Sequence, residues 1–424
     1  MNHHTDQDTL ESQQLDLISS SVSYADETPL LSSVSNGISM PSSVVFLTNT
    51  MTGMGLLAIA FCYRNGIVLN LILTSVLALF SVISFGLLVD VSTKSNLEDY
   101  GELMVPTFGQ RYKKYSNIII GLTLFGVIVL YMLFSSSLLK SVLSEIPGIP
   151  QILLNDKVLI FGPLILFDLP LSLLKSVSAL SKVSYISMVL VIIYVTHSVY
   201  YFSSGLMKNG FDPKGEMKLI SIGKLLIPSL AIQATTYNCH PNIFPTLQKL
   251  ENNTRERKTK TMILVGILSF IIFNITGICS YFTLFDNILD PVTIAYYPHG
   301  RAFTVVTKIL FSLKLVITIP ILFFACRLSF YEIFFTQSVS NAIWNSSGIM
   351  LLCLAGVFAA YFQSIVKVFE VVGGISSPII VYILPAAFYI KICQKENKFK
   401  YYISYMFILF GLSMILVSLY DTFK

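Results

Sequence analysis

Charged residues are scarce in this chain of 424 residues. Asp, Glu, Lys and Arg together make up 12% of it, whereas soluble domains carry roughly 25%. The six cysteines show neither the spacing of a zinc site nor that of a disulfide framework. The net charge of +5 is small and is spread over many short segments, which argues against a nucleic-acid-binding protein. The first 42 residues contain no Lys or Arg, so we expect no cleavable signal peptide.

Apolar residues are abundant instead. They make up 54% of the chain, and the mean hydropathy is +0.72. Apolar runs recur at close to the 20 or so residues that cross the hydrocarbon core of a bilayer. The pattern predicts an all-α polytopic membrane protein with about eleven spans, near 43–63, 67–89, 117–139, 158–174, 183–202, 222–243, 262–285, 303–325, 349–363, 374–392 and 401–420.

The chain is expected to divide into a tail and a membrane domain. Residues 1–42 are rich in Ser, Asp and Gln and predict a disordered tail, whereas residues 43–424 form the membrane domain. Loops on the tail side of the spans hold more Lys and Arg than the opposite loops. By the positive-inside rule, this bias predicts a cytosolic N-terminus and a C-terminus on the other side of the membrane.

Two apolar spans contain residues that break or weaken a helix. The first reads Asn49-Thr50-Met51-Thr52-Gly53-Met54-Gly55, and the sixth reads Gln233-Ala234-Thr235-Thr236-Tyr237-Asn238-Cys239-His240-Pro241. Interruptions at matching places in two halves are typical of a transporter's binding site. The second interrupted span comes five spans after the first, which fits two five-helix repeats of opposite orientation plus one extra helix. The alternative is that Gly53 and Gly55 only allow close helix packing.

Four segments carry a resemblance to a known family. They are residues 42–66 (SSVVFLTNTMTGMGLLAIAFCYRNG), 169–187 (LPLSLLKSVSALSKVSYIS), 237–250 (YNCHPNIFPTLQKL) and 366–390 (VKVFEVVGGISSPIIVYILPAAFYI). Together they resemble the amino acid/auxin permease family, in its sodium-coupled neutral amino acid transporter and vacuolar amino acid transporter branches. In one departure, Ala60 stands where that family usually has proline.

The resemblance implies a fold and an activity. The fold would be the inverted five-plus-five repeat of the amino acid–polyamine–organocation type, with repeats at 43–202 and 222–392 and an extra helix at 401–420. The activity would be secondary active transport of an amino acid coupled to H⁺ or Na⁺, without an enzymatic reaction or another cofactor. Neutral substrates are expected, because no intramembrane acid is placed to hold a cationic side chain; Asp168 is expected to be solvated at the end of its span. An amino-acid sensor at an endolysosomal membrane is the alternative.

The resemblance also places the substrate beside the two interruptions. The carboxylate of an amino acid needs hydrogen-bond donors, which the N–H groups at a half-helix N-terminus can supply. Its ammonium needs acceptors, which we expect from carbonyls of residues 231–235. The predicted substrate-binding residues are Thr52, Gly53, Met54, Gly55, Thr235, Thr236 and Tyr237.

Four further residues are candidates for ion coupling. By the resemblance, Asn49 and Thr318 match positions that hold Na⁺ in sodium-coupled members, although Thr318 could simply bond to its own helix. Lys314 lies one helical turn before Thr318, where its charge would compete with Na⁺ or carry a coupling proton; alternatively it extends toward the membrane surface. His240 could relay protons, but a structural hydrogen bond is favoured for it.

The tail contains a candidate sorting signal. Asp26 is followed at four and five positions by Leu30 and Leu31, an acidic dileucine pattern that cytosolic sorting adaptors read. We therefore expect a vacuolar, lysosomal or endosomal membrane ahead of the plasma membrane. The expected partners are an amino acid, the lipid bilayer and these adaptors, with no nucleic acid.

Overall fold

The structure, a computed structural model, describes residues 37–172, 178–209, 217–298, 300–334, 340–362 and 364–422. These described residues are helical almost throughout, and their only β pairing is an isolated bridge between Ile38 and Leu250. The predicted sorting residues Asp26, Leu30 and Leu31 lie outside the described residues.

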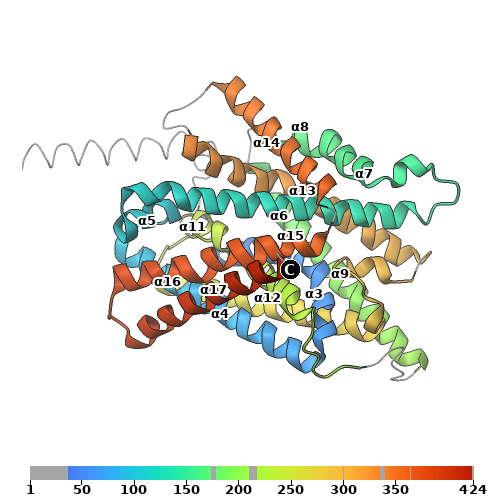
Figure 1. Cartoon of the computed structure of the whole chain (residues 1–424), viewed down its shortest axis with the longest axis horizontal. Helices are drawn as coiled ribbons and strands as arrows, with labels where there is room; N and C mark the ends of the chain where they lie inside the picture. The colour runs from blue at the N-terminus through green and yellow to red at the C-terminus, as the bar shows by residue number, and fades with distance from the viewer. Residues whose placement is uncertain are drawn as a thin grey trace, which may run out of the picture.

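Long apolar helices run side by side along the horizontal direction of Figure 1. Within the described residues, eight helical stretches are long and apolar enough to cross a membrane. They are α4 (Ile67–Ser95), α6 (Lys113–Leu143), α9 (Ser178–Asn209), α12 (Arg255–Leu284), α13 (Ala302–Phe334), α14 (Asn341–Tyr361), the run Ile365–Cys393 and α17 (Lys398–Thr422).

Three predicted spans are divided into shorter helices. In the first, α2 (Met40–Met51) and α3 (Gly55–Cys62) meet at an angle of 57° and would make a ninth span together. The fourth consists of α7 (Asp156–Pro163), the π-helical turn η4 (Leu164–Asp168) and α8 (Leu169–Ser172). The sixth consists of α10 (Leu226–Thr236), the 3₁₀ turn η5 (His240–Asn242) and α11 (Ile243–Leu247). The count of eleven spans stays a prediction.

The run Ile365–Cys393 alternates between α-helical and π-helical turns. It contains α15 (Ile365–Val371), the π turns η8 (Val372–Ser376), η9 (Ile379–Ile383) and η10 (Tyr389–Cys393), and α16 (Leu384–Phe388). In η8, Gly373 brings the backbone close to α10, since a Cβ at this position would lie 1.8 Å from Ala231 O. The outer surface of the bundle is apolar, with exposed side chains such as Leu409 and Leu416 on α17, as expected for helices in contact with lipid.

Charged side chains gather at the two ends of the bundle. At the end where α2 begins, which we call the tail face, Asp90 on α4 binds both Arg255 Nη2 at 2.6 Å and Lys400 Nζ at 2.5 Å. At the opposite end, the far face, Lys308 Nζ lies 3.0 Å from Glu145 Oε1. The short helix α5 (Tyr100–Phe108) lies at the tail face, where the carboxylate of Asp99 accepts a hydrogen bond from the backbone of its first turn.

Candidate functional site

The first span is interrupted at residues 52–54. Thr52 ends α2, since its N–H and its hydroxyl both donate to Thr48 O at 2.8 Å. Gly53 is required there, because a Cβ would lie 1.8 Å from the Tyr131 hydroxyl on α6. Helix α3 then begins at Gly55, and the first N–H groups of a helix have no acceptor within that helix. The break therefore presents donors and the positive end of a helix dipole inside the bundle.

The sixth span is interrupted at residues 237–239. Tyr237 N–H donates to Gln233 O at 2.9 Å and ends α10. The side chain of Asn238 then accepts a hydrogen bond from His240 N–H at 3.1 Å, which starts η5. Pro241 has no N–H and cannot continue the ladder of α10. Both interruptions lie where the sequence predicts them.

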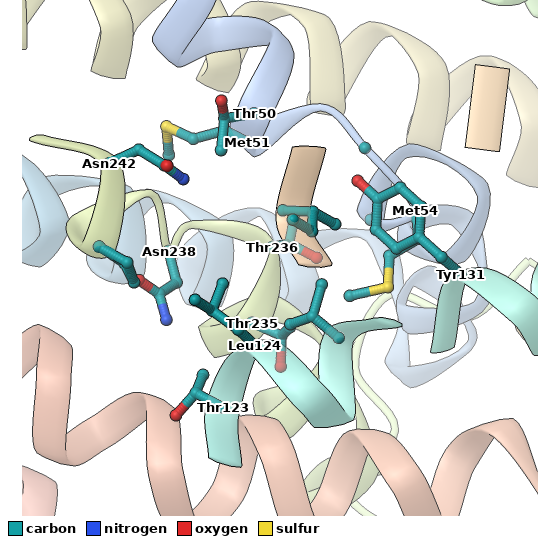
Figure 2. A pocket seen from close by; sticks show the side chains of 15 residues that line it. Thr50, Met51, Met54, Thr123, Leu124, Tyr131, Thr235, Thr236, Asn238 and Asn242 are labelled. Carbon is teal, nitrogen blue, oxygen red and sulfur yellow. The ribbon is translucent and has the colours of Figure 1, made fainter. Parts of the chain in front are cut away.

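A cavity of about 40 Å³ lies between the two breaks. Figure 2 shows the side chains that surround it; the lining residues come from α2, the first break, the start of α3, α6, α10, the segment after α10, and α13. Among the described residues, no Asp, Glu, Lys, Arg or His lines it; its walls are formed by Thr50, Met51, Gly53, Met54, Gly55, Thr123, Leu124, Val127, Tyr131, Thr235, Thr236, Asn238, Pro241, Asn242 and Leu322. The volume holds about three water molecules. The cavity must therefore widen before it can admit an amino acid.

Five of the seven predicted substrate-binding residues line this cavity: Gly53, Met54, Gly55, Thr235 and Thr236. Thr52 and Tyr237 do not line it. The hydroxyl of Tyr237 instead forms a hydrogen bond of 2.7 Å with Thr74 on α4, and its carbonyl accepts one of 3.0 Å from Ser81.

The carbonyls at the end of α10 are already engaged. Ala231 O accepts a hydrogen bond from the hydroxyl of Thr235 at 3.0 Å, and Ile232 O accepts one from Thr236 at 2.7 Å. An ammonium group at these carbonyls would therefore share them with threonine hydroxyls.

The ammonium of Lys314 lies at the first break. This side chain on α13 is 3% exposed, and its Nζ donates to Thr52 O at 3.2 Å and lies 5.1 Å from the ring centroid of Phe311. The Thr318 hydroxyl donates to Lys314 O in its own helix at 2.7 Å. Asn49 is buried, and its Oδ1 accepts no hydrogen bond from the described residues. The side-chain nitrogen of Lys314 therefore already contacts the carbonyl of the residue that ends α2.

His240 lies away from the cavity wall, fully buried against α4. Its Nε2 is 3.0 Å from Ser84 Oγ, and its ring centroid is 4.6 Å from that of Phe85. Its Nδ1 has no hydrogen-bond partner among the described residues. These contacts hold η5 against α4.

Sequence reasoning missed several residues of this site, of which Tyr131 and Asn242 are examples, and it was wrong about Asp168 elsewhere in the bundle. Tyr131 and Asn242 line the cavity, although neither stands out in its segment of the sequence. The expectation for Asp168 was wrong: its side chain is 1% exposed, and its Oδ1 has no partner among the described residues. Asp168 lies in the turn η4, which is buried on the side that faces α13, and the sequence did not predict this turn.

The fold and the site define a class of protein: a multi-pass, all-helical membrane protein with a central cavity at two broken spans. Solved structures share this fold. The chain is similar to MhsT in complex with L-phenylalanine, with a TM-score of 0.61, 10% identity, and coverage of 90% of this chain and 98% of that one. It is also similar to a manganese transporter of Eremococcus coleocola, with a TM-score of 0.52, 10% identity, and coverage of 90% and 94%.

Curated relatives agree with this class. The chain is 24% identical over 391 residues to amino acid transporter AVT6E of Arabidopsis thaliana, covering 87% of this chain and 79% of the relative. It is 22% identical over 360 residues to putative sodium-coupled neutral amino acid transporter 11 of Bos taurus, covering 84% and 77%.

The model of the family described as "Transmembrane amino acid transporter protein" matches residues 36–424. The chain belongs to this family, which confirms the resemblance to the amino acid/auxin permeases. Its members and the relatives above are transporters and not enzymes.

Proposed function

We propose that this protein is a secondary active transporter that carries neutral amino acids by alternating access, with the substrate bound at the two breaks. The observation that supports this proposal is the cavity between them, whose lining contains no charged side chain in the part of the chain that the structure describes. A buried charge on the substrate's side chain would find no counter-ion there, which disfavours cationic and anionic amino acids.

The zwitterionic part of the substrate would bind across the cavity. Its carboxylate would accept hydrogen bonds from the N–H groups at the start of α3, beside the hydroxyl of Tyr131. Its ammonium would face the end of α10 at Thr235 and Thr236. Because main-chain groups would bind the zwitterionic part that all amino acids share, the rest of the cavity would select among substrates by the size of their side chains.

Proton coupling through Lys314 is the mechanism that we favour. The Lys314 ammonium donates to Thr52 O at the end of α2, so loss of its proton would remove a bond that holds the break. A lysine that is buried away from water can release and take up a proton during a transport cycle. Its protonation would thus favour one arrangement of α2 and its deprotonation another.

Sodium coupling is the second candidate. Its support is Asn49, a buried amide whose Oδ1 accepts no hydrogen bond from the described residues. An amide oxygen and the Thr318 hydroxyl are hard oxygen donors of the kind that Na⁺ prefers. A Na⁺ ion would, however, meet the charge of Lys314 nearby on α13.

Transport by purified protein in liposomes tests the function. A panel of radiolabelled amino acids would be offered under a proton gradient alone, a sodium gradient alone, or neither. We expect accumulation of one or more neutral amino acids under the proton gradient. If no member of the panel accumulates under any gradient, the proposed function is wrong.

Lys314→Ala separates the two coupling mechanisms. If Lys314 carries the proton, the variant loses the pH dependence of uptake that wild type shows, while exchange of labelled for unlabelled substrate persists. Lys140→Ala is the control, since Lys140 is half-exposed at the far face and pairs with Asp156. An unchanged pH profile in Lys314→Ala ends the proton mechanism and leaves sodium.

A further inference from the structure

A histidine is enclosed by aromatic rings at the far face. His197 lies on α9 beside the first turn of α13 and is fully buried. The ring centroids of its neighbours lie 4.7 Å (Tyr297), 4.8 Å (Tyr201) and 5.2 Å (Phe303) from that of the imidazole. Tyr201 belongs to α9, Phe303 to α13, and Tyr297 to the loop between α12 and α13. The imidazole therefore fills the joint where these three parts of the chain meet.

The hydrogen bonds of this imidazole are incomplete. Its Nε2 lies 3.2 Å from Thr304 Oγ1, an oxygen that is also 2.7 Å from the hydroxyl of Tyr201. Its Nδ1 has no hydrogen-bond partner among the described residues. A neutral imidazole carries a proton on one nitrogen only, whereas an imidazolium has two N–H groups that both need acceptors. A buried N–H group without an acceptor costs more free energy when it is charged, so the observed packing suits neutral His197.

The nearest full charge also opposes a proton on His197. Lys308 lies one helical turn after Thr304 on the same face of α13 and is fully buried. Its Nζ donates to Ser141 Oγ at 2.8 Å and lies 3.0 Å from Glu145 Oε1. The carboxylate of Glu145 therefore already neutralises one buried cation.

The other groups that face the imidazole are neutral. Tyr194 stacks on it from the preceding turn of α9, and the hydroxyl of Tyr297 donates to Ser280 of α12 at 3.0 Å. Within the described part of the chain no carboxylate pairs with His197, since the Thr304 hydroxyl is the one partner of its two nitrogens. A proton bound here would lack a counter-ion, and the faces of the aromatic rings would offset only part of that cost.

Separation of α9 from α13 and from the loop would expose this imidazole to water. Imidazole in water binds a proton at about pH 6.5. A separated state therefore binds a proton more readily than the packed state does, so acid shifts the population toward separation. The far face is the side that the charge pattern predicts to be opposite the cytosol, which is acidic in a vacuole, lysosome or endosome.

We propose that His197 is a proton-binding site of the far face, and that its protonation opens this face to the compartment beyond it. The proton comes from that compartment and is distinct from the coupling proton assigned to Lys314. The proposal deepens the transport function proposed above and rests on it, since it makes acid favour the state that is reached from the far side. His197 does not line the cavity, so it is a positioning residue.

The accessibility of a cysteine beneath the loop tests this site. Thr293 in η7 (Thr293–Tyr296) is fully buried, and η7 packs against α3, α6 and α13. A Thr293→Cys parent also carries Cys279→Ser and Cys353→Ser, which removes the two partly exposed cysteines of the described residues. In liposomes it is labelled with a membrane-impermeant maleimide at about pH 7 and about pH 5. Because thiols react more slowly in acid, its labelling is divided by that of the exposed residue Gln151→Cys at the same pH.

We expect this labelling ratio to rise at least about threefold from pH 7 to pH 5 in the parent, and at most about 25-fold, the limit for one imidazole that titrates in water. His197→Gln is uncharged at both pH values, so its ratio should change less than about 1.5-fold. His197→Phe, whose ring fills the same space, replaces it if the Gln variant does not fold, with the same expected result. His299→Gln is the matched control; His299 lies outside the described residues, and this variant should keep the acid response.

The proposal is overturned if the parent shows no rise, or if the rise persists when His197 is replaced, which would assign it to another group such as Glu145. Loss of the rise in His299→Gln alone would place the proton site at that residue instead. The label reports opening and not net transport, so the result does not depend on whether Lys314 carries the coupling proton. If the protein transports no amino acid while acid still opens the far face through His197, the proposed function is wrong and the proton site stands.

Discussion

At the scale of single residues, the first break depends on the absence of one side chain. Gly53 lies against the Tyr131 hydroxyl, and Tyr131 is itself buried on α6 among large apolar neighbours. The tyrosine therefore has little room to move away from a new methyl group. Close contact between Gly53 and Tyr131 sets both the path of the chain at the break and the width of the cavity.

Gly53→Ala is expected to lower uptake at least about tenfold, a loss of about 1.4 kcal/mol, because its Cβ would lie 1.8 Å from the Tyr131 hydroxyl. Gly53→Ala combined with Tyr131→Phe should recover part of the activity, since the nearest remaining ring atom is 2.9 Å away. Gly86→Ala is the control, because a Cβ on this glycine of α4 meets nothing within 4 Å. Normal uptake by Gly53→Ala would contradict the conclusion that transport depends on close contact between Gly53 and Tyr131.

At the scale of helices, the sequence predicted where two spans break but not which side chains of other helices pack against the breaks. Polar residues and glycines in an apolar run mark residues 52–54 and 237–239 directly, and the first break forms although Ala60 replaces the family's usual proline. Tyr131 could not be predicted, because it stands in an apolar run of α6 and gains its role only by packing against another helix. The π turn that buries Asp168 has no sequence signal either, since its residues are ordinary helix formers flanked by two prolines.

We expect a substitution at the contact between α10 and η8 to lower uptake as much as a substitution at the first break. Gly373→Ala would place a Cβ 1.8 Å from Ala231 O, a backbone atom that cannot rotate away. We expect uptake to fall at least about tenfold while the protein still elutes as a single species on size-exclusion chromatography. Gly162→Ala in α7, where a Cβ meets nothing within 4 Å, should leave uptake unchanged. Equal uptake by the two variants would show that α10 does not need to approach η8 closely.

At the scale of the whole molecule, the low charge and the repeated apolar runs predicted a helical membrane protein, and the two interruptions together with the family resemblance predicted its fold. Orientation is a separate question, because the same bundle could be inserted either way. The tail face holds Arg255, Lys258, Lys400 and Lys94, each paired with a carboxylate. This concentration of basic residues agrees with the predicted cytosolic position of the N-terminus.

The predicted cytosolic position of the tail leads to a prediction about location that is independent of transport. Leu30→Ala with Leu31→Ala removes the dileucine pattern but leaves Ile38, which pairs with Leu250, unchanged. If adaptors read this signal, the variant moves from endolysosomal membranes to the plasma membrane, as seen by fluorescence microscopy of a tagged chain. Its uptake in liposomes should equal that of wild type, because the substituted residues precede the membrane domain. A matched change at Leu10 and Leu15, each of which follows an acidic residue by four positions but has no second leucine directly after it, should alter neither property. Retention of the Leu30/Leu31 variant on internal membranes would mean that another part of the chain directs its sorting.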